Sequence, residues 1–169
     1  MNKTNNVAIL ILTGIAALTI AVGIGRFSYT PILPYMISEL NLTTTEAGLI
    51  ASSNYLGYLL GSLIPIFPQF PKNIRSIFIY SIFISIISLF AMGLTNTFEV
   101  FILIRFIHGI FSAFVLILGT SLIVSQVQKK GKIFLGTAHF SGVGLGMALS
   151  AIVVSYLGFL NFTWDELWF

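Results

Sequence analysis

Long, nearly unbroken runs of apolar residues dominate the chain, and short polar segments separate them. Each run is about 20 residues long or longer, which is the length of an α-helix that crosses a bilayer. The runs do not alternate between apolar and polar residues, as the strands of a membrane barrel do. The pattern therefore predicts an all-α, polytopic transmembrane helical bundle that forms one domain, residues 1–169. We place five spans at about 7–34, 46–67, 74–95, 98–127 and 133–160, and the start of a sixth span at about 164.

Local signals mark both ends of the second span. Thr43 and Glu46 have the spacing of a capping box, in which the two residues bond each other's backbone N–H groups. Pro65, Pro68 and Pro71 follow the span, and proline cannot continue a helix without losing a hydrogen bond. We therefore expect the helix to begin near Glu46 and to end before these prolines.

Composition supports a membrane protein. Hydrophobic residues make up 57% of the chain and charged residues only 8%, whereas soluble domains carry about 25% charged residues. The apolar run that begins at Val7 is too long for the core of a cleaved signal peptide, so we interpret it as a retained first span. The lipid bilayer is thus the first expected partner.

Several function classes are excluded by the residues that are missing. The chain has no cysteine, so it can form neither a disulfide framework nor a thiol-based site. Its net charge is +3, but the basic residues form no stripe, and we expect no nucleic-acid partner. The sequence shows no metal-ligand cluster, nucleophile–base pair or phosphate-binding loop. We therefore predict neither an enzyme nor a cofactor or metal site.

The charges between the spans are sorted by side, which predicts the orientation. Cytoplasmic loops carry an excess of Lys and Arg, so we expect a multi-pass protein of the inner (plasma) membrane with a cytoplasmic N-terminus. When the spans are threaded alternately, one side carries Lys3, Lys72, Arg75, Lys129, Lys130 and Lys132, and the other carries all five acids, Glu39, Glu46, Glu99, Asp165 and Glu166.

Two arginines, Arg26 and Arg105, fall inside predicted spans. An arginine at the bilayer centre costs roughly 2.5–3.5 kcal/mol on insertion scales, so such residues usually face a cavity or the bundle interior. At about 1.5 Å per residue, both lie roughly 10–12 Å below the outer surface. Alternatively, both side chains snorkel to the outer headgroups, or Arg105 bonds helix-end carbonyls and holds the bundle together.

Further polar residues share helix faces with these arginines. His108 lies three positions after Arg105, on the same face. With Arg26, the two would form a cationic patch on a central cavity, suited to an anionic or carboxylate-bearing solute. Asn54 and Tyr58 are four positions apart and either line a polar path or bond a neighbouring helix.

His108 and His139 are the titratable candidates for a proton relay, because no Asp or Glu lies near the middle of a span. Histidine titrates near neutral pH and can carry protons. The alternative for each is a hydrogen bond that links neighbouring helices.

Small residues recur at a helical period in two spans. Gly57 and Gly61 form a GxxxG pair, and Gly142 and Gly146 form another. Such faces let helix backbones approach closely in lipid, so we expect them to pack helices together. They would also suit helices that rock against each other during transport.

Four segments of the chain carry further information: GIGRFSYTP (23–31) with Pro34, ASSNYLGYLLGS (51–62) with the preceding Ala47 and Gly48, the RFIHG motif (105–109), and FSGVGLGMALS (140–150). Together they resemble the YbfB/YjiJ-like branch of the major facilitator superfamily. The resemblance covers nearly the whole chain. It implies a secondary transporter with two six-helix halves, of which this chain resembles the N-terminal half.

The resemblance also implies roles for particular residues. The first and fourth helices of such transporters line the central cavity, and one half rocks against the other around the substrate. A second transporter half, in the same full-length chain or in a partner, would then complete the protein. The candidate substrate-binding residues are Arg26, Tyr29, Asn54, Tyr58, Arg105 and His108.

The chain departs from the superfamily pattern in three places. The loop after Gly57 and Gly61 lacks the Asp of the usual Gly-x-x-x-Asp-Arg pattern, although it contains Lys72 and Arg75. The fifth span lacks the Gly-Pro of proton antiporters, and the sequence stops where a sixth helix begins. We therefore expect a fragment of a 12-helix transporter for a small solute, which the arginines favour as an anion. The alternatives are a small membrane protein with an interaction or assembly role and a non-functional truncated remnant.

Overall fold

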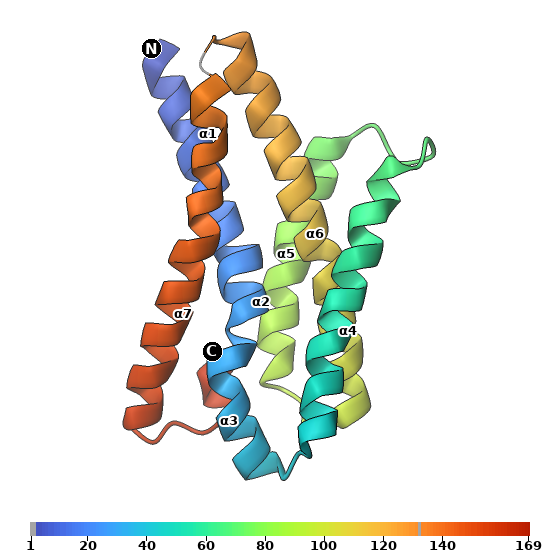
Figure 1. Cartoon of the computed structure of the whole chain (residues 1–169), viewed down its shortest axis with the longest axis vertical. Helices are drawn as coiled ribbons and strands as arrows, with labels where there is room; N and C mark the ends of the chain where they lie inside the picture. The colour runs from blue at the N-terminus through green and yellow to red at the C-terminus, as the bar shows by residue number, and fades with distance from the viewer. Residues whose placement is uncertain (1–2, 132) are drawn as a thin grey trace.

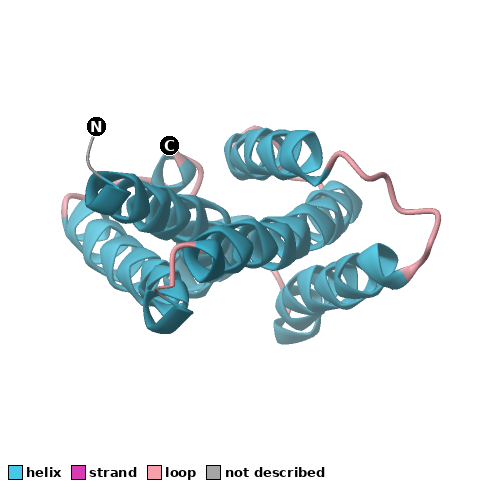
Figure 2. Ribbon diagram, turned by 90° about the horizontal axis from the view of Figure 1, so that it is seen from above, coloured by secondary structure: helices cyan, strands magenta, loops and turns pink. Residues whose placement is uncertain are grey.

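The computed structural model describes residues 3–131 and 133–169. In this part of the chain, five helices are long enough to cross a membrane, and Figure 1 shows their arrangement. Figure 2 looks down the bundle, and the described part of the chain consists of helices and loops. The predicted all-α fold with five spans is therefore confirmed. The helices long and apolar enough to cross a membrane are Val7–Leu40, Thr44–Ile66, Ile74–Met92, Phe98–Lys129 and Leu135–Phe159.

The first span is not one regular helix. It is irregular as far as Ser28, which follows a π-helix and a single short α-helical turn, although Ser28 keeps helical dihedral angles and its N–H bonds the Ile24 carbonyl at 2.9 Å. π-Helical segments inside membrane helices are rare and often lie at functional sites. The span consists of α1 (Lys3–Leu18), the π-helix η1 (Thr19–Ile24), α2 (Gly25–Phe27) and α3 (Tyr29–Leu40).

The first span also extends beyond Pro34, where the sequence placed its end. Pro31 occupies the first turn of α3, where a backbone N–H has no intrahelical acceptor. Pro34 lies inside α3 and removes one further bond, but Ile32 and Met36 on either side of it are completely buried and keep the helix packed. The helix ends only where Asn41 takes a left-handed conformation with φ of 55°.

The remaining spans are joined by short connections. The predicted capping box is confirmed, since Thr43 Oγ1 accepts a bond from the Glu46 N–H at 3.2 Å and Glu46 Oε2 accepts one from the Thr43 N–H at 2.8 Å. The elements after the first span are α4 (Thr44–Leu63), the 3₁₀ turn η2 (Ile64–Ile66), α5 (Ile74–Met92), α6 (Phe98–Lys129), the 3₁₀ segment η3 (Ile133–Phe140), α7 (Ser141–Phe159) and the 3₁₀ turn η4 (Glu166–Trp168).

Where the sequence predicted the start of a sixth span, the chain folds back onto the bundle. The turn η4 buries Leu167 and Trp168 in an apolar cluster with Phe101. The Trp164 N–H also donates a hydrogen bond to Glu39 Oε1 at 3.2 Å. The turn η4 packs against α5 and α7, while Trp164 contacts Glu39 of α3 and Phe101 of α6.

The loops alternate between the two ends of the bundle. In Figure 1 the N-terminus, the α4–α5 connection and the α6–η3 connection lie at the upper end, which we call the basic end. Lys72, Arg75, Lys129 and Lys130 lie there, whereas Lys132 falls outside the described residues. All five acids lie in segments at the opposite, acidic end.

Two clusters of buried apolar side chains pack along the first span, and polar side chains lie between the two clusters. One cluster, which includes Tyr29 and Phe101, fills the acidic end, and a second, which includes Val22 and Val115, fills the middle. Outward-facing apolar side chains are strongly exposed, as Phe159 is at 81%, which fits contact with lipid. The polar residues of α6 between positions 101 and 115 therefore face the first span between two apolar clusters.

Candidate functional site

The intramembrane polar residues gather where the first span meets α4 and α6. On α6, Arg105 is only 4% exposed. Its Nη1 and Nη2 groups donate hydrogen bonds to the carbonyl oxygens of Gly25 and Arg26, both at 3.2 Å. These carbonyls lie directly before Ser28, and a side chain that bonds to helix carbonyls commonly accompanies such an irregularity. Arg105 therefore connects α6 to the irregular part of the first span and does not reach outward.

Tyr29 completes this connection. The Arg105 Cζ atom lies 4.8 Å from the centroid of the Tyr29 ring, within the range of a cation–π interaction. The Tyr29 hydroxyl donates a hydrogen bond to the Ala47 carbonyl of α4 at 2.9 Å. One buried aromatic side chain thus contacts the arginine of α6 and the backbone of α4.

Arg26 has a different environment from Arg105. Its side chain is half-buried, and its Cζ atom lies 4.0 Å from the ring centroid of Tyr58 and 5.2 Å from that of Tyr55. The buried Nε of Arg26 has no hydrogen-bond partner, and the five acids of the chain lie at the acidic end. The Nε of Arg105 also has no partner, so the two arginines differ in the terminal nitrogens, which in Arg105 both donate to carbonyl groups.

Asn54 on α4 and His108 on α6 form a buried contact between these helices, each only 1% exposed. The Asn54 amide nitrogen donates to the Arg105 carbonyl at 2.8 Å and lies 3.1 Å from His108 Nδ1. Because this nitrogen is a donor, His108 Nδ1 is assigned as the acceptor and the ring proton as carried by Nε2. That Nε2 has no hydrogen-bond partner and faces Gly25.

The cationic surface is therefore narrower than the patch predicted from the sequence. Arg105 and His108 do share a face of α6, but that face is buried against the first span. The neutral His108 tautomer adds no charge. Cavities lie at both ends of the described part of the bundle and are introduced below. Arg26, Arg105 and His108 line none of them. What remains is one half-buried arginine beside two tyrosines.

His139 lies elsewhere, near the basic end, and is fully buried. Its Nδ1 lies 2.6 Å from the Gly136 carbonyl, which can only accept, and its Nε2 lies 3.0 Å from Thr120 Oγ1. Both ring nitrogens are thus engaged, and the ring links η3 to α6. The hydrogen bonds of the described residues do not connect it to His108.

The four predicted packing glycines lie at close helix contacts. A Cβ atom added at Gly57 or Gly61 on α4 would collide with the backbone of α6 at Phe106 or Ile110. A Cβ atom at Gly142 or Gly146 on α7 would collide with the backbone of the first span. These glycines therefore form the contact of α4 with α6 and the contact of α7 with the first span, which are the most extensive contacts of α6 and of the first span.

The family comparison agrees with this architecture. A family model described as an uncharacterised MFS-type transporter, YbfB, matches residues 18–169. The chain belongs to this YbfB-type family. Membership confirms the predicted major facilitator superfamily transporter and its YbfB-like branch, and the five apolar helices make the chain a multi-pass membrane protein. Neither a search of curated proteins nor a search of solved structures found a match.

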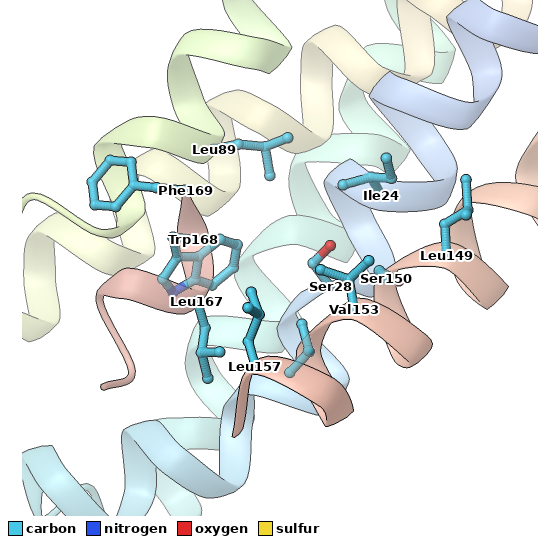
Figure 3. Close-up of a pocket in the computed structure, with 11 residues that line it drawn as sticks. Ile24, Ser28, Leu89, Leu149, Ser150, Val153, Leu157, Leu167, Trp168 and Phe169 are labelled. Carbon is cyan, nitrogen blue, oxygen red and sulfur yellow. The ribbon is translucent and has the colours of Figure 1, made fainter. Parts of the chain in front are cut away.

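An apolar cavity of about 230 Å³ lies at the acidic end of this YbfB-type chain, between the first span, α5, α7 and the C-terminal segment. Figure 3 shows Ser28 and Ser150 among otherwise mostly apolar side chains around it. The Ser150 hydroxyl donates to the Met147 carbonyl at 3.0 Å. None of the six predicted substrate-binding residues lines this cavity, so its chemistry differs from that of the Arg26 region.

Sequence reasoning missed several partners in the site. The carbonyl groups of Gly25 and Arg26, which bind Arg105, have no signature in side-chain patterns. Tyr55 was visible as a polar residue one turn from Tyr58, but nothing in its spacing predicted a contact with Arg26. Gly23 and Gly25, two positions apart and close to Pro31, were the available signal for an irregular helix.

Proposed function

We propose that this YbfB-type transporter carries a small anionic solute by alternating access, and that the Arg26 guanidinium contacts the anion. The observation that supports this proposal is the contrast between the two intramembrane arginines. Both terminal nitrogens of Arg105 donate to carbonyl groups and its side chain is buried, whereas Arg26 is half-buried beside Tyr55 and Tyr58. Because a guanidinium pairs bidentately with a carboxylate or a phosphate, an anion is the ligand that best satisfies it.

The other predicted site residues take supporting roles in this proposal. Tyr58 stacks on the Arg26 guanidinium at 4.0 Å and restricts its orientation, and its hydroxyl is a second group for the solute. Tyr29, Asn54, Arg105 and His108 hold the first span, α4 and α6 around Arg26 through their buried hydrogen bonds.

The orientation and a second transporter half belong to the same proposal. The basic end faces the cytoplasm of the inner membrane, as the positive-inside rule predicts for its Lys and Arg residues. A second transporter half, from the same full-length chain or from a partner, faces the Arg26 surface, and the two halves rock about the solute.

Protection from arginine modification tests the anion contact without a transport assay. Membranes that contain the chain are treated with phenylglyoxal, and mass spectrometry measures modification of Arg26 with lactate, succinate or inorganic phosphate present, and with choline as a cationic control. We expect at least one anion to slow modification of Arg26 about fivefold or more, with no effect of choline. Arg105 serves as an internal control that stays unmodified because it is buried. Unchanged modification of Arg26 with all three anions contradicts the anion contact.

Uptake into proteoliposomes tests transport itself. Hydrogen bonds to charged groups contribute about 1.5–3 kcal/mol each, so Arg26→Gln should lower anion uptake about tenfold or more. Lys72→Gln, which removes a cation in the α4–α5 loop, should leave uptake unchanged. A stable complex with another membrane protein and no flux would instead favour the assembly role.

A further inference from the structure

A groove at the basic end lies away from the Arg26 region, between α1, α5 and α6. Two cavities of about 440 Å³ and 300 Å³ share Leu10, Thr13 and Gln126 as lining residues, so they form one continuous depression. We call it the basic-end groove. Figure 1 shows the three helices that form it ending or beginning at the same end of the bundle.

The mouth of the groove is cationic and polar. Arg75, the second residue of α5, lines the larger cavity, and Lys130, which follows the last residue of α6, lines the smaller one. Both side chains are exposed. Thr13 and Gln126 add neutral hydrogen-bonding groups between them. Because all five acids of the chain lie at the acidic end, no carboxylate neutralises this mouth.

The floor of the groove is apolar. Phe78 and Ile79 lie one turn deeper than Arg75 on α5, and Leu122 and Gly119 lie two to three turns deeper than Lys130 on α6. At about 1.5 Å per residue, the distance along α6 from Lys130 to Gly119 is about 16 Å. Half of a bilayer's hydrocarbon core is about 15 Å thick, so the α6 wall of the groove is about as deep as one leaflet. Phe78 packs on Gly119, so Arg75 lies about one turn above the floor and Lys130 lies at the outer rim.

We propose that the basic-end groove binds one anionic phospholipid. The phosphodiester lies between Arg75 and Lys130, and one acyl chain lies along Phe78 and Leu122. Two cationic side chains above an apolar floor, with an α6 wall of about one-leaflet depth, match both parts of such a lipid, whereas a small polar solute would leave the floor unsatisfied. A basic end that faces the cytoplasm would meet the leaflet in which anionic lipids are enriched.

Native mass spectrometry of the purified chain tests the proposal with phosphatidylglycerol as the probe and phosphatidylcholine as the zwitterionic comparison. We expect phosphatidylglycerol to bind at least tenfold more tightly. A basic residue near a membrane surface favours an anionic lipid by about fivefold in binding constant, so the double variant Arg75→Gln, Lys130→Gln should remove the preference. Lys72→Gln is the matched control, because Lys72 is exposed at the same end but does not line the groove.

The soluble headgroup separates a lipid site from a phosphate site. Glycerol phosphate without acyl chains should not compete with phosphatidylglycerol at equal concentration, since it cannot occupy the apolar floor. Equal competition, a preference that survives in the double variant, or an equal loss in Lys72→Gln each overturns the proposal. Arg26 does not line the groove. If phosphatidylglycerol does not bind, the proposal of anion transport through Arg26 is unaffected, and if anion transport fails, the lipid proposal is unaffected.

Discussion

The contact between α7 and the first span gives a sharp test, because three glycines on one turn of α7 have different surroundings. A Cβ atom at Gly146 would lie 2.6 Å from the Gly23 Cα atom, and one at Gly142 would collide with the Ile15 carbonyl. A Cβ atom at Gly144 would meet nothing within 4 Å. Alanine at these three positions therefore changes helix propensity equally and packing very differently.

The expected magnitudes follow from these distances. To accept alanine at Gly146, the two backbones must separate by about 1 Å, and a gap of that size forfeits about a quarter to a half of each dispersion contact. Overpacking of this kind costs about 1–3 kcal/mol. Gly142→Ala should cost somewhat more, because its carbonyl also accepts a hydrogen bond from Thr19 Oγ1 at 3.0 Å, and such interhelical bonds contribute about 0.6 kcal/mol on average.

Unfolding in mixed micelles by titration with dodecyl sulfate measures these costs. Trp164 and Trp168 are the two tryptophans of the chain, and both are buried at the acidic end, so their fluorescence reports loss of tertiary structure. Gly142→Ala and Gly146→Ala should lower the free energy of unfolding by about 1–3 kcal/mol, whereas Gly144→Ala should be neutral or slightly stabilising. An equal effect of all three substitutions would refute the reasoning from close approach.

Three further predictions concern other parts of the molecule. Arg105→Met removes two buried hydrogen bonds and one cation–π contact and should lower the free energy of unfolding by about 2–4 kcal/mol, with partial recovery in Arg105→Lys, measured by the same titration. Because the chain has no cysteine, a membrane-impermeant maleimide applied to intact cells should label Asn96→Cys and not Lys72→Cys, and the reverse pattern would contradict the proposed orientation. Thr43→Ala should cost about 1 kcal/mol by loss of the capping box, whose Oγ1 bonds the Glu46 N–H, and Thr43→Ser should cost less.

The helical architecture could be predicted from the sequence because each span depends on one property, a long apolar run. The capping box at Thr43 and Glu46 was equally visible, since its spacing and residue types carry the whole signal. The end of the first span could not be predicted from the sequence. Pro34 weakens the helix locally, but the tertiary packing of Ile32 and Met36 decides whether the helix continues.

The site could be predicted in its residues but not in its arrangement. Arg26 and Arg105 are the same residue type at the same expected depth, so nothing in the sequence distinguishes them. Their difference depends on which backbone carbonyl groups each guanidinium reaches, and only Arg105 reaches those of Gly25 and Arg26. Hydropathy patterns report side chains and not backbone bonding, and for this reason the division of roles emerges only from the structure.

Gly25 and Arg26, two neighbouring residues of the first span, take part in both the helix packing and the proposed anion contact. The carbonyl groups of Gly25 and Arg26 are held by Arg105 of α6, while the side chain of Arg26 lies against the tyrosines of α4. A shift of α6 relative to α4 must therefore act on Arg26 from both sides, through its carbonyl and through its guanidinium. In the proposed cycle, the anion contact and the helix movement cannot be independent, because the residue that holds the solute is also the one that the two helices share.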